Sequence, residues 1–353
     1  MSADRKTSIA PSAEKEAMKT ALACSLAIWI SYSYAWPEPY WSCMAIVLSR
    51  HSDKGTSWLL LSKQSGGVAL GTFIGIATLT VSQSAFLFCL LFAVWTGAVA
   101  YRCAIDPPSP GSRFGGFTAT TVAMAGLFQN DPDINIALIR GAQILLGVFL
   151  AAVVNLQLHW KRESPQNVAT PSRLIDQQMR RLARQHAGRV VLALFGTLFT
   201  WLWLDIPAGP FAMAAASVIA TPAIDSPMIR FSQRLAGILI GTSLAIVFTA
   251  LFLPEMERIQ EFELLVFGIF WLCSFINYRS QKSAFIGLQS SITFAVVLVR
   301  DAHQSSDLLP IWQRGSALVL GLVISFLVID VLTRRTIRAS RRAAPLFRPR
   351  QRS

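Results

Sequence analysis

The chain has 353 residues, of which 53% are hydrophobic and only 14% are charged. A soluble domain carries about 25% charged residues, so this chain lacks the charge that a water-facing surface needs. The net charge of +13 at pH 7 would suggest nucleic acid as the partner of a soluble protein. Here the basic residues lie between apolar blocks, where they orient a membrane protein, and we expect no nucleic-acid partner.

Twelve apolar blocks follow one another along the chain, most of them close to the ~20 residues that a helix needs to cross a bilayer. They are 18–36, 39–49, 64–81, 84–101, 114–129 and 137–158 in the first half, and 188–204, 209–221, 235–253, 262–277, 284–299 and 311–333 in the second. Two blocks, 39–49 and 209–221, are too short to span alone, and each follows a proline-containing turn. We expect both to be short or broken helices that protein or a wet cavity covers.

The distribution of Lys and Arg predicts the orientation in the membrane. When connections are counted alternately from the N-terminal tail, 28 of the 32 basic residues fall on one side. Because basic residues gather on the cytoplasmic side, we expect both termini in the cytoplasm. The first block has no clean A-x-A cleavage site, which favours an uncleaved first helix over a signal peptide.

Three short motifs of the first half recur in the same order in the second half. GxxxGT at 67–72 returns at 237–242, RGxxxxxG at 140–147 returns at 314–321, and YR at 101–102 returns at 278–279. Such repetition indicates a duplicated six-helix unit, and an even number of helices makes the two repeats parallel. The predicted fold is therefore an all-α integral membrane protein of about 12 transmembrane segments in two parallel six-helix repeats.

This pattern divides the chain into four parts. Residues 1–158 form the first membrane repeat with a short cytoplasmic tail, and residues 159–187 form a basic cytoplasmic linker. Residues 188–333 form the second repeat, and residues 334–353 form a basic tail that lies against anionic lipid headgroups.

The repeated glycines Gly67, Gly71, Gly237 and Gly241 have the small-xxx-small spacing that lets helix backbones approach closely. We interpret them as helix-packing positions.

The repeated arginines, Arg140 and Arg314, lie about one turn inside their blocks, near the outer surface. Their side chains either extend outward to water or turn inward to one shared cavity. Glycines on the same helix faces favour the inward orientation. A guanidinium in such a cavity suits a carboxylate, with which it forms paired hydrogen bonds.

The two short blocks begin with aromatic residues: Tyr40 and Trp41 in the first and Phe211 in the second. They belong either to the aromatic belt at the membrane surface or to a substrate site at the start of a short helix, where free amides attract anions. Asp225 and Asp330 are the candidate proton-coupling carboxylates, although both lie where ordinary solvated or salt-bridged carboxylates occur.

The sequence contains no metal cluster, phosphate loop or nucleophile motif, so we expect no cofactor, no metal and no enzyme activity. The five cysteines form no CxxC or Cys/His group and are interpreted as small buried residues.

The sequence resembles the fusaric acid resistance and aromatic acid exporter superfamily. The residues that carry the resemblance are Pro39-Tyr40-Trp41 at the start of the short second block and the GxxxGT motif at 67–72. Both are echoed in the second half, although Gly209-Pro210-Phe211 stands where a tyrosine–tryptophan pair would be expected. The large cytoplasmic regions of such exporters are reduced here to the linker and the tail.

The resemblance implies a multi-pass protein of the bacterial inner membrane that exports aromatic or other small organic acids, and we expect the proton gradient to drive this export. It also implies a periplasmic adaptor of the membrane-fusion type as a partner, and leaves a homo-oligomer open. Two alternatives remain at this stage. The chain is an organic-anion channel with the same residues, or it is a non-transporting scaffold that holds the adaptor.

Overall fold

The computed structural model describes residues 11–52, 58–105, 110–125, 133–158, 177–206, 208–219, 227–252, 259–280, 283–299 and 307–343. In these ranges the chain forms twelve helices and no strand. The first-half helices are α1 (Pro11–Ser33), α2 (Tyr40–Ser52), α3 (Trp58–Thr80), α4 (Ala85–Ile105), α5 (Pro110–Ala123) and α6 (Ile134–Leu158). The second-half helices are α7 (Gln177–Leu204), α8 (Gly209–Ile219), α9 (Pro227–Leu251), α10 (Ile259–Arg279), α11 (Ala284–Leu298) and α12 (Leu309–Ala343).

Each helix corresponds to one apolar block, which confirms the all-α membrane fold. Seven helices, α3, α4, α6, α7, α9, α10 and α12, contain segments that are long and apolar enough to cross a bilayer. Two helices extend beyond their apolar blocks, because α7 begins at Gln177 and α12 continues to Ala343. Both extensions are rich in Arg and Ala, good helix formers that let a helix continue beyond its apolar part.

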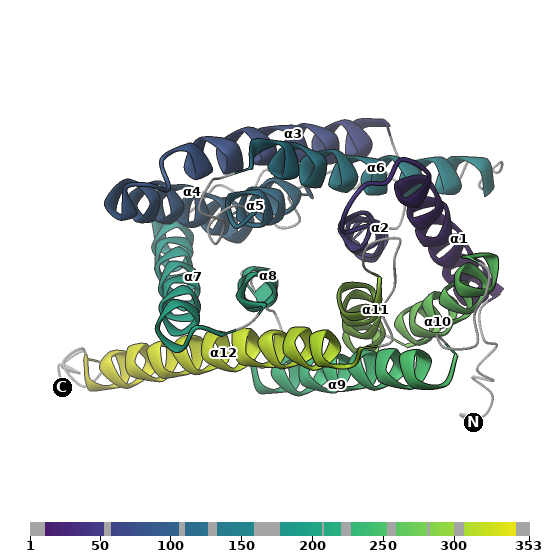
Figure 1. Ribbon diagram of the computed structural model, residues 1–353. Helices are drawn as coiled ribbons and strands as arrows, with labels where there is room; N and C mark the ends of the chain where they lie inside the picture. The colour runs from purple at the N-terminus through teal and green to yellow at the C-terminus, as the bar shows by residue number, and fades with distance from the viewer. Residues whose placement is uncertain are drawn as a thin grey trace, which may run out of the picture.

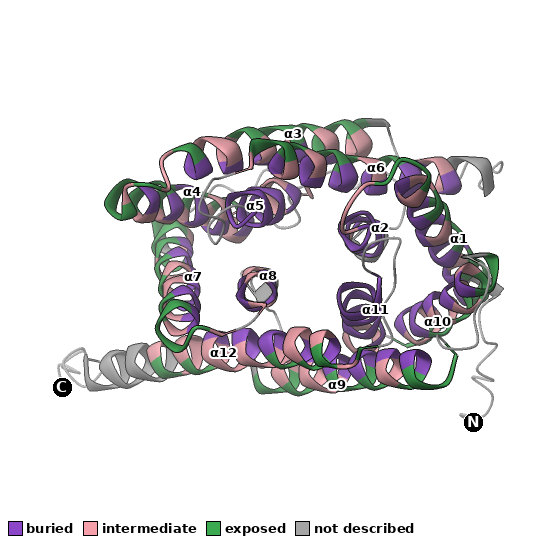
Figure 2. Cartoon of the chain, viewed as in Figure 1, coloured by how far each residue is buried: buried purple, intermediate pink, exposed green. Residues whose placement is uncertain are grey.

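Four helices are shorter than the rest, with 13 residues in α2, 14 in α5, 11 in α8 and 15 in α11. At about 1.5 Å per residue they are roughly 17–23 Å long, less than the ~30 Å thickness of the hydrocarbon layer. The sequence predicted this for α2 and α8 but not for α5 and α11. All four lie inside a frame formed by the other eight helices (Figure 1), and their described residues are largely buried (Figure 2).

The two halves have the same helix packing, and they also contact each other. Within the halves, α3 packs on α5 and α2 on α6, just as α9 packs on α11 and α8 on α12. Between the halves, α1 packs on α10 and α7 on α4, so the first helix of each half lies against the fourth helix of the other. The inner helices also cross the boundary, with α2 against α11 and α8 against α5.

The repeated glycines lie where two helices approach most closely. A Cβ on Gly67 would overlap the backbone of Gly111 in α5. In the second half, a Cβ on Gly241 would lie only 2.7 Å from the carbonyl oxygen of Ser290 in α11. The backbones of α3 and α9 can therefore contact the inner helices only because these positions have no side chain.

Two neighbouring glycines of α3 allow a matched test of this packing. Gly67→Ala should lower the stability of the folded protein by about 1–3 kcal/mol, because the added methyl overlaps backbone atoms. Gly66→Ala adds the same methyl where nothing lies within 4 Å, and it should raise helix stability by up to ~1 kcal/mol. Thermal unfolding of the detergent-solubilised protein measures both effects. Equal melting temperatures for the two variants would contradict the assigned packing.

Candidate functional site

The turns that precede α2 and α8 have the same unusual backbone. Ala35 and Glu38 have φ values of 50° and 60°, and Asp205 and Ala208 have φ values of 45° and 64°. The interval is 170 residues in both cases, from 35 to 205 and from 38 to 208. A left-handed conformation is uncommon for residues other than glycine. Its occurrence at matching positions shows that both halves begin their short inner helix with one specific turn.

The helices that carry the arginines also begin alike. Asp133 precedes α6, and its side chain accepts a hydrogen bond of 2.8 Å from the backbone N–H of Asn135. Asp307 precedes α12, and its side chain accepts one of 2.9 Å from the backbone N–H of Leu309. Such caps stabilise a helix start by about 1 kcal/mol. Each capping aspartate lies seven residues before its arginine. The side chains of the two arginines therefore extend from equivalent positions of their helices.

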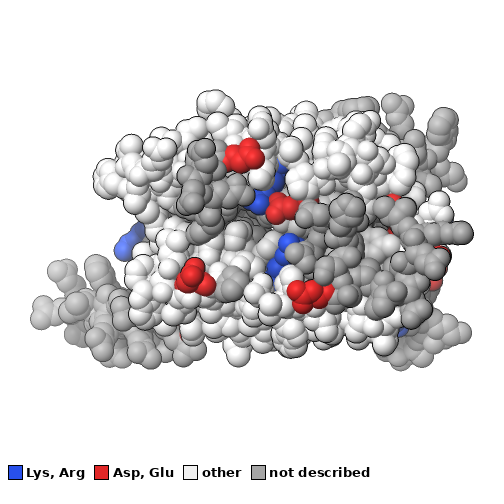
Figure 3. Space-filling view, in the orientation of Figure 1, with Lys and Arg blue, Asp and Glu red and all other residues white. Residues whose placement is uncertain are grey.

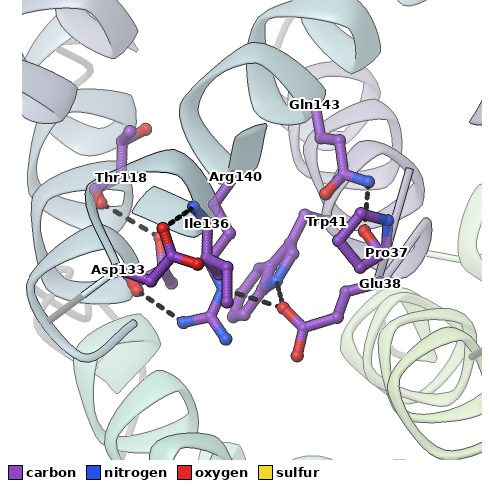
Figure 4. Close-up of polar contacts among 9 residues, drawn as sticks. Pro37, Glu38, Trp41, Thr118, Asp133, Ile136, Arg140 and Gln143 are labelled. Carbon is purple, nitrogen blue, oxygen red and sulfur yellow. Dashed lines mark hydrogen bonds and ion pairs between the residues drawn. The ribbon is translucent and has the colours of Figure 1, made fainter. Parts of the chain in front are cut away.

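Arg140 is held by groups of two inner helices and the turn before one of them (Figure 4). Its Nε donates to Oε2 of Glu38 at 2.8 Å, and its terminal nitrogen donates to the carbonyl oxygen of Thr121 at 3.1 Å. The guanidinium carbon lies 5.4 Å from the ring centre of Trp41. The indole N–H of Trp41 in turn donates to the same Glu38 oxygen at 3.0 Å. The first half therefore binds a carboxylate of its own between an arginine and a tryptophan.

The charge of Glu38 is stabilised by its neighbours. Burial raises the pKa of its carboxyl, but the positive charge of Arg140 and the hydrogen bonds from Arg140 and Trp41 outweigh burial and leave the pKa below its usual value of 4.5. The ion pair lies near the surface, since the side chain of Arg140 is 10% exposed and that of Glu38 is 25% exposed. The lowered pKa favours the ionised form of the Glu38 carboxyl.

Arg314 has a similar environment in the second half. Its terminal nitrogen donates to the carbonyl oxygen of Val296 in α11 at 2.7 Å. Its guanidinium carbon lies 4.9 Å from the ring centre of Phe211 and 5.5 Å from that of Tyr40. Since Tyr40 belongs to α2 and Phe211 to α8, this arginine contacts inner helices from both halves.

The aromatic rings connect the two arginines. Tyr40 lies 4.9 Å from Trp41 and 5.6 Å from Phe211, between ring centres. Arg140, Trp41, Tyr40, Phe211 and Arg314 thus form one run of contacts, here called the arginine–aromatic cluster. Both guanidinium groups contact inner helices. Figure 3 shows basic side chains at the centre of one face, beside a recessed strip and near acidic side chains.

Of the two carboxylates predicted for proton coupling, the one within the described residues, Asp330, is not part of the cluster. Asp225 lies outside the described residues. Asp330 is half-buried on α12, sixteen residues beyond Arg314 and therefore roughly 24 Å further along the helix.

Two polar residues near the cluster were not singled out by the sequence as its members. Glu38 pairs with an arginine 102 positions away, a contact that no local pattern reveals. Gln143 is fully buried and donates from its side-chain amide to the carbonyl oxygen of Pro37, which ties α6 to the turn before α2.

Comparison with known proteins identifies the family. Residues 26–154 match a family described as fusaric acid resistance protein-like, and residues 158–348 match the fusaric acid resistance protein family. The chain belongs to the fusaric acid resistance protein family. The resemblance drawn from the short motifs is thereby confirmed, and family membership extends over both halves of the structure.

Individual relatives match only part of the chain. The chain is 29% identical over 117 residues to the multidrug resistance protein MdtO of Shigella flexneri, of Escherichia coli K12 and of Escherichia coli O157:H7. The match covers 33% of this chain and 17% of each relative, so the matched segment spans about a sixth of the length of these proteins. No solved structure matches this chain.

Removal of the Glu38 charge should destabilise the protein, because it leaves the Arg140 cation largely buried without its counter-ion. We expect Glu38→Gln to lower the unfolding free energy by about 1–3 kcal/mol. The double variant Glu38→Gln with Arg140→Leu should regain part of this loss in a double-mutant cycle. Asp205→Asn, a change at an exposed carboxylate of the equivalent turn, serves as the control. Additive effects of the two cluster substitutions would show that the ion pair contributes nothing.

The ion pair between Glu38 and Arg140 also predicts that the stability of the protein depends on pH. A carboxyl whose pKa is lowered by folding adds stability above its usual pKa of 4.5, and this stability is lost as the pH falls through the lower pKa of the folded state. The wild type should therefore be more stable than Glu38→Gln at neutral pH, and the difference in melting temperature should shrink below pH 4.5. A difference that is constant with pH would exclude a charged Glu38 as its source.

Proposed function

We propose that this protein is a transporter of the bacterial inner membrane that exports small organic acids, aromatic carboxylates among them. The observation that carries the proposal is Arg314, whose guanidinium lies against aromatic rings of inner helices from both halves. A guanidinium binds a carboxylate through paired, charge-assisted hydrogen bonds. Aromatic side chains beside it favour a flat or apolar body on the same molecule.

The arrangement of the inner helices supports a transport role for this cluster. Both α2 and α8 begin beside the cluster, where their first backbone N–H groups and positive dipole ends favour anions. Each of these helices also packs against an inner helix of the other half, α2 on α11 and α8 on α5. A small movement of one half relative to the other would therefore open or close the cluster, as alternating access requires.

The names of the relatives support an export function, since MdtO is a multidrug resistance protein. In our proposal the proton gradient drives export, with Asp225 and Asp330 as the candidate proton carriers. A periplasmic adaptor of the membrane-fusion type is the proposed protein partner, with a second copy of the chain as a further one.

Transport of radiolabelled benzoate into proteoliposomes tests this proposal. The wild type should accumulate benzoate when a pH gradient is imposed, and Arg314→Ala should reduce the rate by about 10–100-fold, the loss expected for a charge-assisted hydrogen bond. Arg279→Ala removes an equal charge at the exposed end of α10, and it should leave the rate unchanged.

Three outcomes would overturn the proposal. Discrete single-channel currents carried by benzoate would identify an anion channel. Accumulation that ignores the pH gradient would exclude proton-driven export. Absence of any accumulation, together with retained binding to a periplasmic adaptor, would identify a scaffold.

A further inference from the structure

The Arg140 end of the arginine–aromatic cluster binds a carboxylate with the groups that suit a substrate acid. Oε2 of Glu38 accepts hydrogen bonds from Nε of Arg140 at 2.8 Å and from the indole N–H of Trp41 at 3.0 Å. The guanidinium carbon of Arg140 lies 5.4 Å from the centre of the indole ring. A cation, a neutral N–H donor and an aromatic wall together recognise an aromatic carboxylate. The protein therefore places its own carboxylate where these groups converge (Figure 4).

The backbone that carries this carboxylate is held in place, whereas the side chain can rotate. The carbonyl oxygen of Pro37 accepts a hydrogen bond from the side-chain amide of Gln143. The carbonyl oxygen of Glu38 accepts one from the backbone N–H of Trp41 at 3.2 Å. The side chain of Glu38 is 25% exposed and has three rotatable bonds, so a change of rotamer can move its carboxylate away from Arg140. This exchange requires no movement of a helix.

The second half shows that the turn itself does not need a glutamate. The position equivalent to Glu38 is Ala208, 170 residues later, and its φ is 64° against 60°. The carbonyl oxygens of both residues accept the N–H of the aromatic residue three positions later, at 3.2 Å and 3.1 Å. Because the same turn forms around a methyl group, the carboxylate of Glu38 has a role other than shaping the backbone.

Arg140 stays anchored when its carboxylate partner changes. A terminal nitrogen of its guanidinium donates to the carbonyl oxygen of Thr121 in α5 at 3.1 Å, a contact that does not involve Glu38. A free carboxylate can form two parallel hydrogen bonds with a guanidinium. These bonds offset the advantage that Glu38 gains from its attachment to the chain. A carboxylate is present before and after the exchange, which avoids the cost of a buried cation without a counter-ion.

We propose that Glu38 is a tethered competitor of the transported acid, whose carboxylate occupies Arg140 until the carboxylate of a small organic acid displaces it. This inference rests on the proposed function and adds a gate to its binding site. Arg140 binds the two carboxylates in turn. An acid that enters the cluster must break the ion pair between Glu38 and Arg140. The return of Glu38 to Arg140 then favours release of the acid, which a transporter needs as much as binding.

Equilibrium binding of benzoate to the full-length protein in detergent at neutral pH tests the competition. Glu38→Gln should bind benzoate about tenfold more tightly than the wild type, the gain expected if Glu38 occupies Arg140 about 90% of the time. Glu38→Asp keeps the charge on a shorter side chain, so its affinity should lie between the two. Arg140→Leu in the Glu38→Gln background should abolish the gain, because it removes the guanidinium for which both carboxylates compete.

Asp205→Asn is the matched control for the loss of one negative charge. Asp205 is an exposed carboxylate of the equivalent turn, so its removal changes the net charge by the same amount and leaves Glu38 on Arg140. At about 0.15 M salt, where exposed charges are screened, benzoate affinity should stay within about twofold of the wild type.

Misfolding cannot imitate this result, because Glu38→Gln should bind benzoate more tightly although it melts at a lower temperature than the wild type. Equal affinities of Glu38→Gln and the wild type would overturn the proposal. So would an equal gain in Asp205→Asn, a gain that survives Arg140→Leu, or the absence of benzoate binding in the wild type and in every variant.

The outcome is independent of transport activity. If Glu38→Gln binds benzoate more tightly but proteoliposomes of the wild type do not accumulate it, the competition stands and the proposed function fails. If proteoliposomes accumulate benzoate while Glu38→Gln binds it with the affinity of the wild type, the function stands and the competition fails.

Discussion

The structure depends on one constraint, namely that backbone polar groups cannot face hydrocarbon without hydrogen-bond partners. The four inner helices of 11–15 residues are too short to cross the bilayer, so their ends would be exposed to lipid in an open bundle. The frame of eight longer helices removes this cost by enclosing them (Figure 1). Glycines at the contacts of α3 and α9 allow the enclosure to be tight. A short enclosed helix, in turn, places its N-terminus within the protein, where it can face an anion.

Duplication supplies two copies of this arrangement, and the copies differ mainly in a few side chains. The turns, the capping aspartates and the arginine contacts are present in both halves. Glu38 corresponds to Ala208, and Tyr40 to Pro210. Because the backbone is shared, these two differences change the charge and the aromatic walls of one end without altering its frame.

Much of the fold could be predicted from the sequence, since twelve apolar blocks, repeated glycines and the distribution of basic residues are local signals. The short lengths of α5 and α11 could not be predicted, because the apolar blocks 114–129 and 284–299 are nearly as long as a spanning helix. The first turns of α7, at 177–187, lie outside the apolar block 188–204, since a hydropathy pattern ends where charged residues begin, whereas helix propensity continues. In the site, the repeat singled out both arginines and the aromatic residues. The pairing of Arg140 with Glu38 joins segments 102 residues apart, and only the packing of α6 against the turn before α2 reveals it. The binding role of these residues stays a prediction.

Cysteine accessibility at position 208 tests the central claim most directly, because this residue lies beside the proposed carboxylate site at the start of α8. Ala208→Cys should react with a membrane-impermeant thiol reagent that is added from the outer side of the membrane, and benzoate should slow the reaction several-fold. Ala216→Cys, at a buried position further along α8, should not react. A residue 208 thiol that reacts from neither side, or at a rate that benzoate does not change, would contradict a water-accessible carboxylate site between the two halves.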